Sequence, residues 1–469
     1  MKVGVLTLSV LLLLASCRVG PEYQRPDYPM PSTFRGEAPQ GHTDVMSLGD
    51  LSWWQIFQDE QLQGLIRTAL IENYDVRIAV THILDAQAQL TFTRSAQFPS
   101  LDANVSIPYS RTEGAGALGT PKETLAPVGG LNLSFEIDLW GRLQRATEAA
   151  RADLLASVEA RWIVVTSLVS TVATAYFQLR ELDLELEIAR RTLASRQDSL
   201  RLVQRREAGG LASLLDVRQA EILVTTAAQT IPDIERRIAL TEHLLSILLG
   251  RNPSDVPRGR PLAQQLALPA VPAGLPTTLL ERRPDIRQAE QQLIAANARI
   301  GVAKALLFPQ VSLTDSASIG ATGSNTRSYW TFLGPMGLFG VGPTVTWPVF
   351  NAGRIGAGVA SAEAREQEAL LSYQQTIQQA IREVVDALVE YSKRQEFRVQ
   401  QEVLTRTLQD AVGLSRSRYA GGVTSYLEVL DTERQLFTAE LDLVQAQGSE
   451  LAAVVQLYKA LGGGWQPAE

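Results

Sequence analysis

Cysteine is almost absent from this sequence of 469 residues, and the single Cys17 permits no internal disulfide. Histidine is nearly as scarce, and His42, His82 and His243 lack the spacing of a metal site. The glycines near residue 340 form no phosphate-binding loop, because Pro343 and a strand-like pattern follow where a helix should begin. No nucleophile and base stand out as a pair either. These absences argue against an enzyme and against a metal or organic cofactor.

Positive charge is also in deficit. The formal net charge is −7, and loss of residues 1–16 would make it −8 because Lys2 is the only charged residue among them. This balance disfavours nucleic acid as a partner. Beyond the N-terminus, no segment has the roughly 20 consecutive apolar residues of a transmembrane helix. The remaining composition, with 45% hydrophobic residues, is that of a globular protein with a large core.

The N-terminus carries a targeting signal. Lys2, the apolar run Val3–Leu14 and the small residues Ala15-Ser16 follow the order of a secretory signal peptide, and the run is too short to span a bilayer. The sequence Leu14-Ala15-Ser16-Cys17 resembles a bacterial lipobox, which implies that Cys17 is acylated and becomes the first mature residue. Arg18 follows, where an Asp would retain a lipoprotein in the inner membrane. The resemblance therefore favours the outer membrane.

Residues 17–52 are rich in proline, which denies the backbone regular helix or sheet. We expect an extended tether there. Trp53 and Trp54 then open the folded body, and we interpret them as packing anchors rather than a ligand site.

A long unit occurs twice. The run Arg206–Val217 returns at Arg418–Val429, an offset of 212 residues. Two further pairs repeat at nearly the same offset: Phe98-Pro99 with Phe308-Pro309, and Gly141-Arg142 with Gly353-Arg354. A solenoid repeat would have a period of about 20–50 residues. The sequence therefore predicts two copies of one large structural unit.

Long helices are predicted in both copies. The stretch Arg142–Ala208 contains no Gly or Pro, and Val359–Ala420 is interrupted only by Gly413, so each could form a rod of about 90–100 Å at ~1.5 Å per residue. Apolar residues recur at helical spacing, as in coiled coils. Each rod ends at a glycine pair, and a second rod returns, from Ser213 towards Leu249 and from Ser425 towards Leu461.

Three weaker helix predictions complete this pattern. Pro232 should kink the first return rod. Shorter helices are expected from about Gln61 to Gln97 and from Pro284 to Leu307, the latter with proline in its first turn.

The segments between the rods alternate with period two. Leu101–Ser110 and Leu131–Leu139 place apolar residues on odd positions and mostly polar residues on even ones, including Glu136 and Asp138. Weaker counterparts lie at Val311–Thr314, before Asp315 breaks the face, and along Phe339–Val349. Strands of ~9–11 residues with one apolar face suit a transmembrane β-barrel. A soluble, half-buried sheet is the alternative for any single segment.

Four such strands cannot close a membrane barrel, because the smallest have about 8 strands. An open edge in lipid would leave backbone groups unpaired. If the strands span lipid, several chains must share one barrel.

The layout resembles the TolC-type outer-membrane efflux factors, and several motifs resemble their OprM/NodT lipoprotein branch across the whole mature chain. The motifs that carry the resemblance are the lipobox, Val19-Gly20-Pro21-Glu22-Tyr23, Trp53-Trp54, Asp138-Leu139-Trp140-Gly141-Arg142, Glu281-Arg282-Arg283-Pro284-Asp285-Ile286 and Tyr458-Lys459-Ala460-Leu461-Gly462-Gly463-Gly464-Trp465.

This resemblance implies a mainly α fold with a membrane β-barrel, in which an internally duplicated chain forms a long coiled-coil α-barrel. A homotrimer would share a 12-stranded barrel, with four strands from each chain. The implied divisions are 1–16 signal peptide, 17–52 lipidated tether, 53–98 with 142–307 and 353–461 periplasmic helical tunnel and equatorial region, 99–139 and 309–350 barrel strands, and 462–469 C-terminal tail.

The implied function is that of an outer-membrane channel in a tripartite efflux system. It would be a passive exit duct that carries drugs or other toxic small molecules from an inner-membrane pump to the exterior. The implied partners are a periplasmic membrane-fusion adaptor, the inner-membrane efflux pump and outer-membrane lipid. The only attached group would be the covalent lipid on Cys17.

The resemblance also implies a channel gate at the hairpin ends. The family's gate tyrosine and acidic residues fall on Tyr419, Glu428 and Asp431, and trimerisation would gather three copies of each carboxylate into a cation-attracting ring. Asp216 would bond Tyr419. Thr424 occupies a position where the TolC pattern can have Arg, so an Arg-based latch is not expected. The turns that would contact the adaptor are Gly209, Gly210, Leu211, Gly421, Gly422 and Val423.

Three alternatives remain open. A type I secretion duct would export polypeptides through the same architecture. A periplasmic adaptor lipoprotein would have one hairpin and a compact lipoyl-like β module, whereas this chain has two hairpins and strands in both halves. A non-conducting trimeric stalk would not need strands with Glu136 and Asp138 on a polar face.

Overall fold

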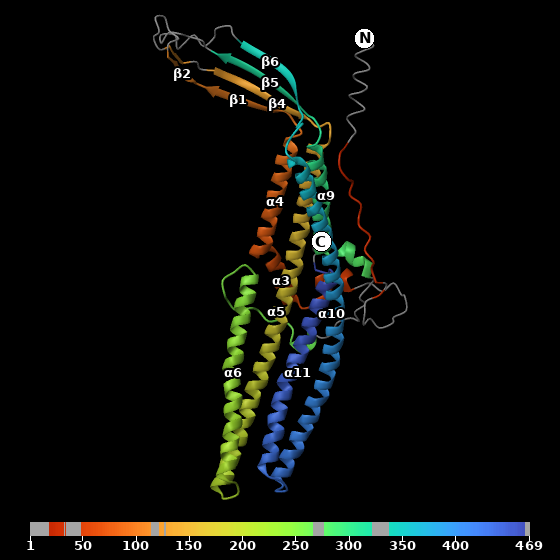
Figure 1. Ribbon diagram of the computed structural model, residues 1–469. Helices are drawn as coiled ribbons and strands as arrows, with labels where there is room; N and C mark the ends of the chain where they lie inside the picture. The colour runs from red at the N-terminus through yellow and green to blue at the C-terminus, as the bar shows by residue number, and fades with distance from the viewer. Residues whose placement is uncertain are drawn as a thin grey trace. The chain divides into compact units, whose positions relative to one another are not determined.

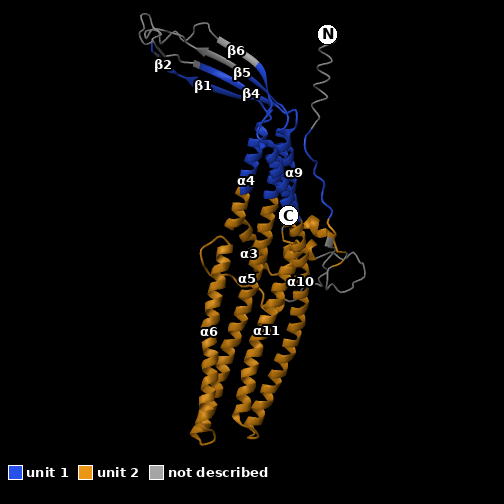
Figure 2. Cartoon of the chain, viewed as in Figure 1, with its two compact units in different colours: residues 1–27, 82–157, 288–373 blue, residues 28–81, 158–287, 374–469 orange. Residues whose placement is uncertain are grey.

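The computed structural model describes residues 18–31, 33, 48–113, 122–125, 128–265, 276–320 and 337–464 (Figure 1). The chain forms two compact units, coloured in Figure 2. Unit 1 comprises residues 1–27, 82–157 and 288–373, and unit 2 comprises residues 28–81, 158–287 and 374–469. Cys17 and the residues before it lie outside the described residues.

Four long helices follow the predicted duplication. Helices α5 (Arg142–Ala208) and α10 (Arg354–Ala420) have 67 residues each, and the return helices α6 (Leu214–Leu248) and α11 (Tyr426–Ala460) have 35 each. Helix α10 begins before the predicted Val359 because its two early glycines do not prevent helix formation. Pro232 lies inside α6 without ending it.

The helix predicted for residues 61–97 is wrong as a single element. It divides at Asn73 into α3 (Glu60–Glu72) and α4 (Tyr74–Ser95). Asn73 takes an extended ψ of 132°, and its Oδ1 accepts a hydrogen bond of 2.8 Å from the Asp75 amide, so it caps the second helix. The shorter elements are η1 (Leu48–Asp50), α2 (Trp53–Ile56), α7 (Leu262–Gln265), η3 (Pro276–Thr278), α8 (Leu279–Arg282) and α9 (Pro284–Ala305).

Unit 1 contains an antiparallel four-stranded sheet in the order β1-β4-β5-β6. The strands are β1 (Ser100–Ser106), β4 (Val128–Ile137), β5 (Gln310–Gly320) and β6 (Gly337–Thr346). The predicted strand 101–110 is interrupted near Pro108, which lacks a backbone donor. Beyond the interruption, β2 (Tyr109–Thr112) and β3 (Lys122–Leu125) form an unpredicted two-stranded sheet.

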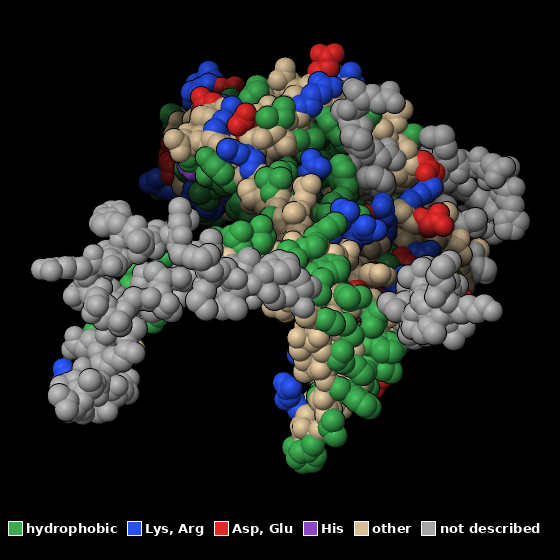
Figure 3. Space-filling view, turned by 90° about the horizontal axis from the view of Figure 1, so that it is seen from above, with side chains coloured by type: hydrophobic (Ala, Val, Ile, Leu, Met, Phe, Trp, Pro, Cys, Tyr) green, Lys and Arg blue, Asp and Glu red, His purple; other side chains and the backbone are tan. Residues whose placement is uncertain are grey.

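The strand register gathers most apolar residues on one face of the sheet, although Asp315 of β5, which pairs with Leu133, interrupts that face as its sequence position indicated. Leu133 pairs with Leu101 on one side, and Phe135 pairs with Leu313 on the other. Even positions form the opposite face, where Asn132 Nδ2 donates to Asn104 Oδ1 over 3.0 Å. Strand β4 is thus the centre of a sheet with one apolar and one polar face. In the view of Figure 3, hydrophobic side chains form an extended green area with few charged side chains among them.

The core of unit 2 surrounds the middle of α5 and the C-terminal part of α11. Its largest buried side chains include Trp53, Tyr176, Leu182 and Tyr458, each no more than 1% exposed. The Tyr458 hydroxyl donates to the Leu51 carbonyl over 2.8 Å. These contacts hold the short helices 48–56 against the long ones.

Candidate functional site

The two hairpin ends have the same backbone geometry. At the first, the amide of Leu211 donates to the carbonyl of Arg206 over 2.8 Å, and at the second Val423 donates to Arg418 over 3.0 Å. Gly210 and Gly422 both have a φ of +73°, a left-handed conformation that favours glycine. The repeat therefore preserves the turn as well as the sequence.

The turns expose apolar side chains. Leu211 is 77% exposed in the first turn, and Val423 is 73% exposed in the second. Leu214, Leu215 and Leu427, which follow the turns, are also exposed. Exposed apolar residues clustered at both hairpin ends are a suitable surface for a protein partner.

The expected hydrogen bond between Tyr419 and Asp216 is not formed, although both residues are described. Asp216 caps its own helix, because its Oδ2 accepts from the amide and the hydroxyl of Ser213, each over 2.9 Å. The Tyr419 ring packs against Tyr426, with 5.1 Å between centroids, and beneath the guanidinium of Arg206 at 4.6 Å. The Asp216 carboxylate therefore caps its own helix through Ser213 instead of accepting a hydrogen bond from Tyr419.

Glu428 and Asp431 lie on one face of α11, and each has a local partner. Thr424 donates its hydroxyl to the Glu428 carboxylate, and Arg418 Nε lies 3.2 Å from Glu428 Oε1. Asp431 is paired with Arg434 at 2.9 Å and with Gln435 at 2.6 Å. Thr424 thus contacts the acidic position directly, and the arginine paired with Glu428 is Arg418.

An apolar cluster joins the two hairpins behind these residues. Its buried members come from α5, α6 and α11: Val203, Val217, Ala220, Leu223, Tyr426, Val429 and Leu430. Tyr419 and Leu200 pack against it. The second return helix is therefore packed on the first hairpin, so separating the hairpins would expose this cluster.

Arg196 lies at the contact between the two hairpins, about two turns of α5 before Val203 of the apolar cluster. Its Nη1 donates to the Leu223 carbonyl of α6 over 2.8 Å, and its guanidinium lies 4.7 Å from the ring centre of Phe437 in α11. Burial lowers the Arg196 pKa, although Glu433 opposes that effect. Arg416 of α10 completes the junction, since it donates to Glu433 Oε1 over 2.8 Å. Charged side chains thus connect all four long helices.

The polar face of the sheet ends in two carboxylates that sequence reasoning left unpaired. Arg142 binds Glu136 through two nitrogens, at 3.0 and 2.6 Å. Asp138 accepts a hydrogen bond of 2.9 Å from the Gln144 amide in the first turn of α5. Both residues therefore help to connect β4 with the start of that helix.

Comparisons with known proteins agree with this architecture. A family model described as outer membrane efflux protein matches residues 65–251 and 275–463. The chain belongs to the outer membrane efflux protein family. The solvent efflux pump outer membrane protein SrpC of Pseudomonas putida is 36% identical and is aligned over 100% of both chains. The cation efflux system protein CusC of Escherichia coli K12 is 34% identical over 98% of this chain and 99% of CusC.

Solved structures show the same fold. A crystal structure of CusC has a TM-score of 0.85 and 33% identity, covering 96% of this chain and 100% of that one. The open state of the MtrE outer membrane channel of Neisseria gonorrhoeae has a TM-score of 0.84 and 31% identity, covering 96% and 99%. This member of the family is thus an outer-membrane channel component of an efflux system with a TolC-like fold. It resides in the outer membrane and extends into the periplasm.

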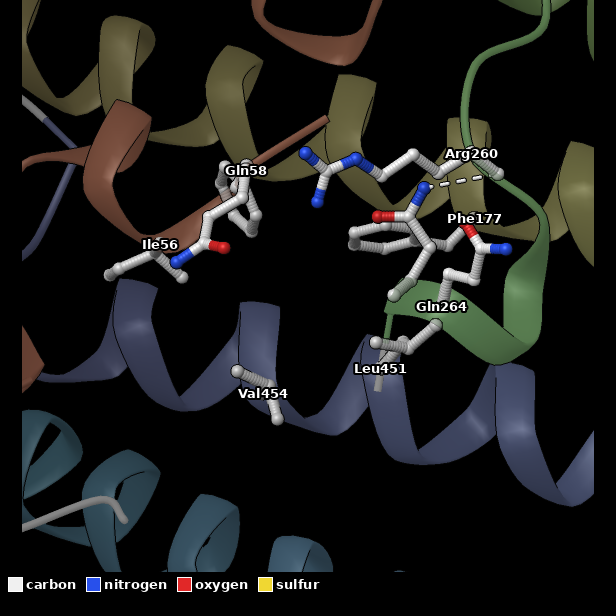
Figure 4. Close-up of a pocket in the computed structure, with 9 residues that line it drawn as sticks. Ile56, Gln58, Phe177, Arg260, Gln264, Leu451 and Val454 are labelled. Atoms are coloured by element: carbon white, nitrogen blue, oxygen red, sulfur yellow. Dashed lines mark hydrogen bonds between the residues drawn. The ribbon is translucent and has the colours of Figure 1, made fainter. Parts of the chain in front are cut away.

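One pocket of unit 2 offers a test for enzyme chemistry. Its apolar wall includes Phe177 and Leu451, and its polar rim includes Gln58 and Gln264 (Figure 4). Arg260 is the single ionisable residue among those that line it, so the pocket lacks an acid and base pair. No metal-binding group of three His, Cys, Asp or Glu occurs in the described part of the chain. Membership of the efflux protein family indicates a channel rather than an enzyme.

A buried carboxylate beside this pocket has a structural role. Asp59 is 1% exposed and accepts hydrogen bonds from Tyr176 Oη at 2.8 Å, Gln265 Nε2 at 2.6 Å and the Arg260 amide at 2.9 Å. Burial raises the pKa of Asp59, but these hydrogen bonds together lower it by more. The pKa of Asp59 in the folded protein is therefore below its ordinary value. Asp59 also caps α3 through the Gln61 amide.

Sequence reasoning missed the charged residues of the hairpin junction. Four buried residues of α5 recur at a spacing of seven, Leu182, Ala189, Arg196 and Val203, with exposed fractions of 0, 0, 3 and 1%. A charged residue in such a stripe was a readable signal. Helix α5 also has one window apolar enough to cross a membrane by length and composition, but 61% of that window is buried in the structure, as in a packed core helix.

Proposed function

We propose that this protein is a passive exit duct formed by a homotrimer, in which each chain supplies four strands to a 12-stranded barrel. The observation that carries the proposal is the four-stranded sheet with one apolar face, one polar face and two edges. Within the described residues, β1 pairs only with β4, and β6 pairs only with β5. Lipid cannot satisfy such edges, whereas equivalent edges of neighbouring chains can.

The apolar face would contact lipid, and the polar face would line water. Leu101, Val105 and Leu131 are exposed on the odd positions of the sheet, as lipid-facing residues of a separate chain should be. The even positions carry Asn104 and Asn132, which are hydrogen-bonded to each other. This polarity favours a conducting barrel over a solid stalk.

The helical hairpins would form the periplasmic tunnel, with their turns contacting a membrane-fusion adaptor. The exposed Leu211 and Val423 supply the apolar part of that surface. An inner-membrane pump would deliver the cargo through the adaptor. We retain residues 53–98, 142–307 and 353–461 as the tunnel and equatorial region, and 99–139 with 309–350 as the barrel segments.

The gate would lie at the hairpin ends. Three copies of Glu428 and Asp431 would form acidic rings, and the Arg418 and Thr424 contacts of Glu428 would restrain them. Tyr419 would act by packing against Tyr426 rather than by bonding Asp216. An adaptor that binds the separated hairpins more tightly would shift the channel towards its open state.

The N-terminus would add a lipid anchor. Removal of residues 1–16 would leave an acylated Cys17, followed by the tether 17–52. The described tether residues of unit 1 are held to that unit: the Val19 amide donates to the Trp140 carbonyl over 3.1 Å, and Arg25 pairs with Glu290 at 2.9 Å. The end of the tether is not extended, because Leu48–Asp50 form the 3-10 helix η1 in unit 2. Mass spectrometry of the mature N-terminus tests this anchor, and an unmodified start elsewhere would remove it.

The cargo would be small toxic molecules. Relatives are named for the efflux of solvents, toluene and cations. The long whole-chain match to such proteins supports this class over secretion of polypeptides. A passive duct need not recognise its cargo, so specificity would reside in the pump.

Two measurements test the proposal. Purified full-length protein in planar bilayers should conduct ions as a trimer, while an intact trimer without conductance would indicate a stalk. Expression in cells that lack their own outer-membrane efflux channel should restore resistance to an organic solvent when a matching adaptor and pump are supplied. Export of a polypeptide without restored resistance would favour the secretion alternative.

A further inference from the structure

Glu181 is a carboxylate of α5 that the proposed gate does not use. It lies about 40 Å along the helix from the turn at Gly209, at ~1.5 Å per residue. Its carboxylate lies directly against Gly448 of α11, so closely that a Cβ atom at position 448 would overlap Glu181 Oε2. Among the described residues, no donor is hydrogen-bonded to the Glu181 carboxylate. Glycine thus provides a seat for an unpaired acidic group at the contact between the two hairpins.

The nearby cation is already engaged. Glu185, one turn further along α5 and 2% exposed, accepts from Arg237 of α6 over 3.1 Å and from Gln445 of α11 over 3.0 Å. The charged groups that act on Glu181 are therefore Glu185 and the shared Arg237, while α11 presents the uncharged Gly448 and Gln445. A second negative charge is poorly compensated at this position.

The titration of Glu181 agrees with this arrangement. Burial and, after it, the charge of Glu185 raise its pKa to about 7, although Arg237 acts in the opposite direction. In water the group would be charged throughout the neutral range. At the contact with α11, its charge instead changes across that range.

We propose that Glu181 is a proton-sensitive contact between the α5–α6 hairpin and the α10–α11 hairpin. The neutral carboxyl group sits against Gly448 and holds α11 on α5. Ionisation places two carboxylates in the same partly dry region, and it favours separation of α11 from α5. The consequence for conductance rests on the proposed function: acid favours the closed channel, and neutral to alkaline pH favours its opening.

The sign follows from proton linkage. Because the docked state holds the proton more tightly, docking is favoured most below the unperturbed pKa of 4.5, and this contribution is lost as pH rises through about 7. If the separated state regains the unperturbed value, the docking equilibrium changes about tenfold per subunit between pH 6 and pH 8. Three subunits would make the dependence steeper.

Hydrogen exchange of the full-length protein in detergent tests the contact without relying on conductance. Protection factors of α11 peptides around Gly448, corrected for the intrinsic pH dependence of exchange, should fall up to about tenfold per subunit between pH 6 and pH 8. Glu181→Gln should remove this pH dependence. Glu187→Gln, at an exposed position of the same helix, should retain it.

A second pair of variants tests the seat itself. Gly448→Ala should lower α11 protection at both pH values, whereas Gly413→Ala should not, because a Cβ at 413 meets no atom within 4 Å. Unchanged pH dependence in Glu181→Gln, or equal protection in the two alanine variants, would overturn the proposal. If Glu181→Gln does not fold, wild-type protection of α11 that is unchanged between pH 6 and pH 8 would still overturn the proposal. Absence of wild-type conductance would refute the exit duct and leave the exchange result standing.

Discussion

Replacement of Leu133 by Arg tests whether the sheet spans the outer membrane. Leu133 is the sixth residue of the ten in β4 and lies on the mainly apolar face, between Leu101 of β1 and Asp315 of β5. Ten residues at ~3.4 Å, tilted by about 40°, rise roughly 25 Å, which matches the apolar band of a membrane barrel. Leu133 therefore lies at mid-depth, where Arg costs about 2–4 kcal/mol. Three independent copies would cost about 6–12 kcal/mol per trimer.

Neighbouring positions on the same strand supply the controls. Ser134→Arg adds the same side chain to the polar face and should leave trimer formation nearly unchanged. Ile137→Arg at the strand end should cost only about 0–1 kcal/mol, because it lies near the interface. Urea titration of folding into lipid vesicles, followed by the trimer band on semi-native gels, measures these differences. Equal losses from Leu133→Arg and Ser134→Arg would refute the assignment of the two faces.

Three further predictions concern the gate, the core and a turn. Combining Glu428→Gln with Asp431→Asn should weaken cation selectivity, measured as the reversal potential in a salt gradient. Tyr419→Phe should leave conductance unchanged, because the Tyr419 hydroxyl does not bond Asp216. A clear rise in conductance would indicate that the Tyr419–Asp216 bond does form in the closed channel. Asp59→Asn should lower the free energy of unfolding by about 3 kcal/mol at neutral pH. Because the pKa of Asp59 is lowered in the folded protein, this stability difference between wild type and variant should be lost as pH falls through the folded pKa, as measured by urea titrations. A stability difference that persists in acid would contradict the linkage. Gly422→Ala should cost about 1–2 kcal/mol in the same assay, because its φ of +73° strains any residue with a Cβ; no loss would show that the turn rearranges.

The sequence predicted the long helices well because few glycine or proline residues interrupt their pattern. Helix α5 has the expected bounds Arg142–Ala208, and both return helices end within one residue of the prediction. The sequence did not predict the break at Asn73, because asparagine can also lie within a helix. Asn73 caps α4 only because its backbone is extended at that point. The four segments of the large sheet could be predicted as strands from their alternation, but their order and the separate β2–β3 sheet could not.

The candidate site was predicted in outline rather than in its contacts. The glycine turns recur with the expected backbone, but Asp216 caps α6 instead of bonding Tyr419. Two acceptable partners competed for one carboxylate, and the local one, Ser213, prevailed. The contacts of Arg196 and Glu181 depend on which helices pack against α5. The spacing of residues along α5 can show that a charged residue lies on its buried face, but it cannot show which residues of the other helices it contacts.

The register of β4 with β5 has a consequence for the order of folding. Ile137 pairs with Val311, so the sheet joins segments that are separated by all the helices from α5 to α9. Contacts between such distant segments form slowly when the intervening chain is unstructured, whereas helices form locally and quickly. The hairpins should therefore fold first and bring the two strands together. If the sheet forms the barrel as proposed, insertion into the outer membrane would then be a late step, which follows the folding of the helical hairpins.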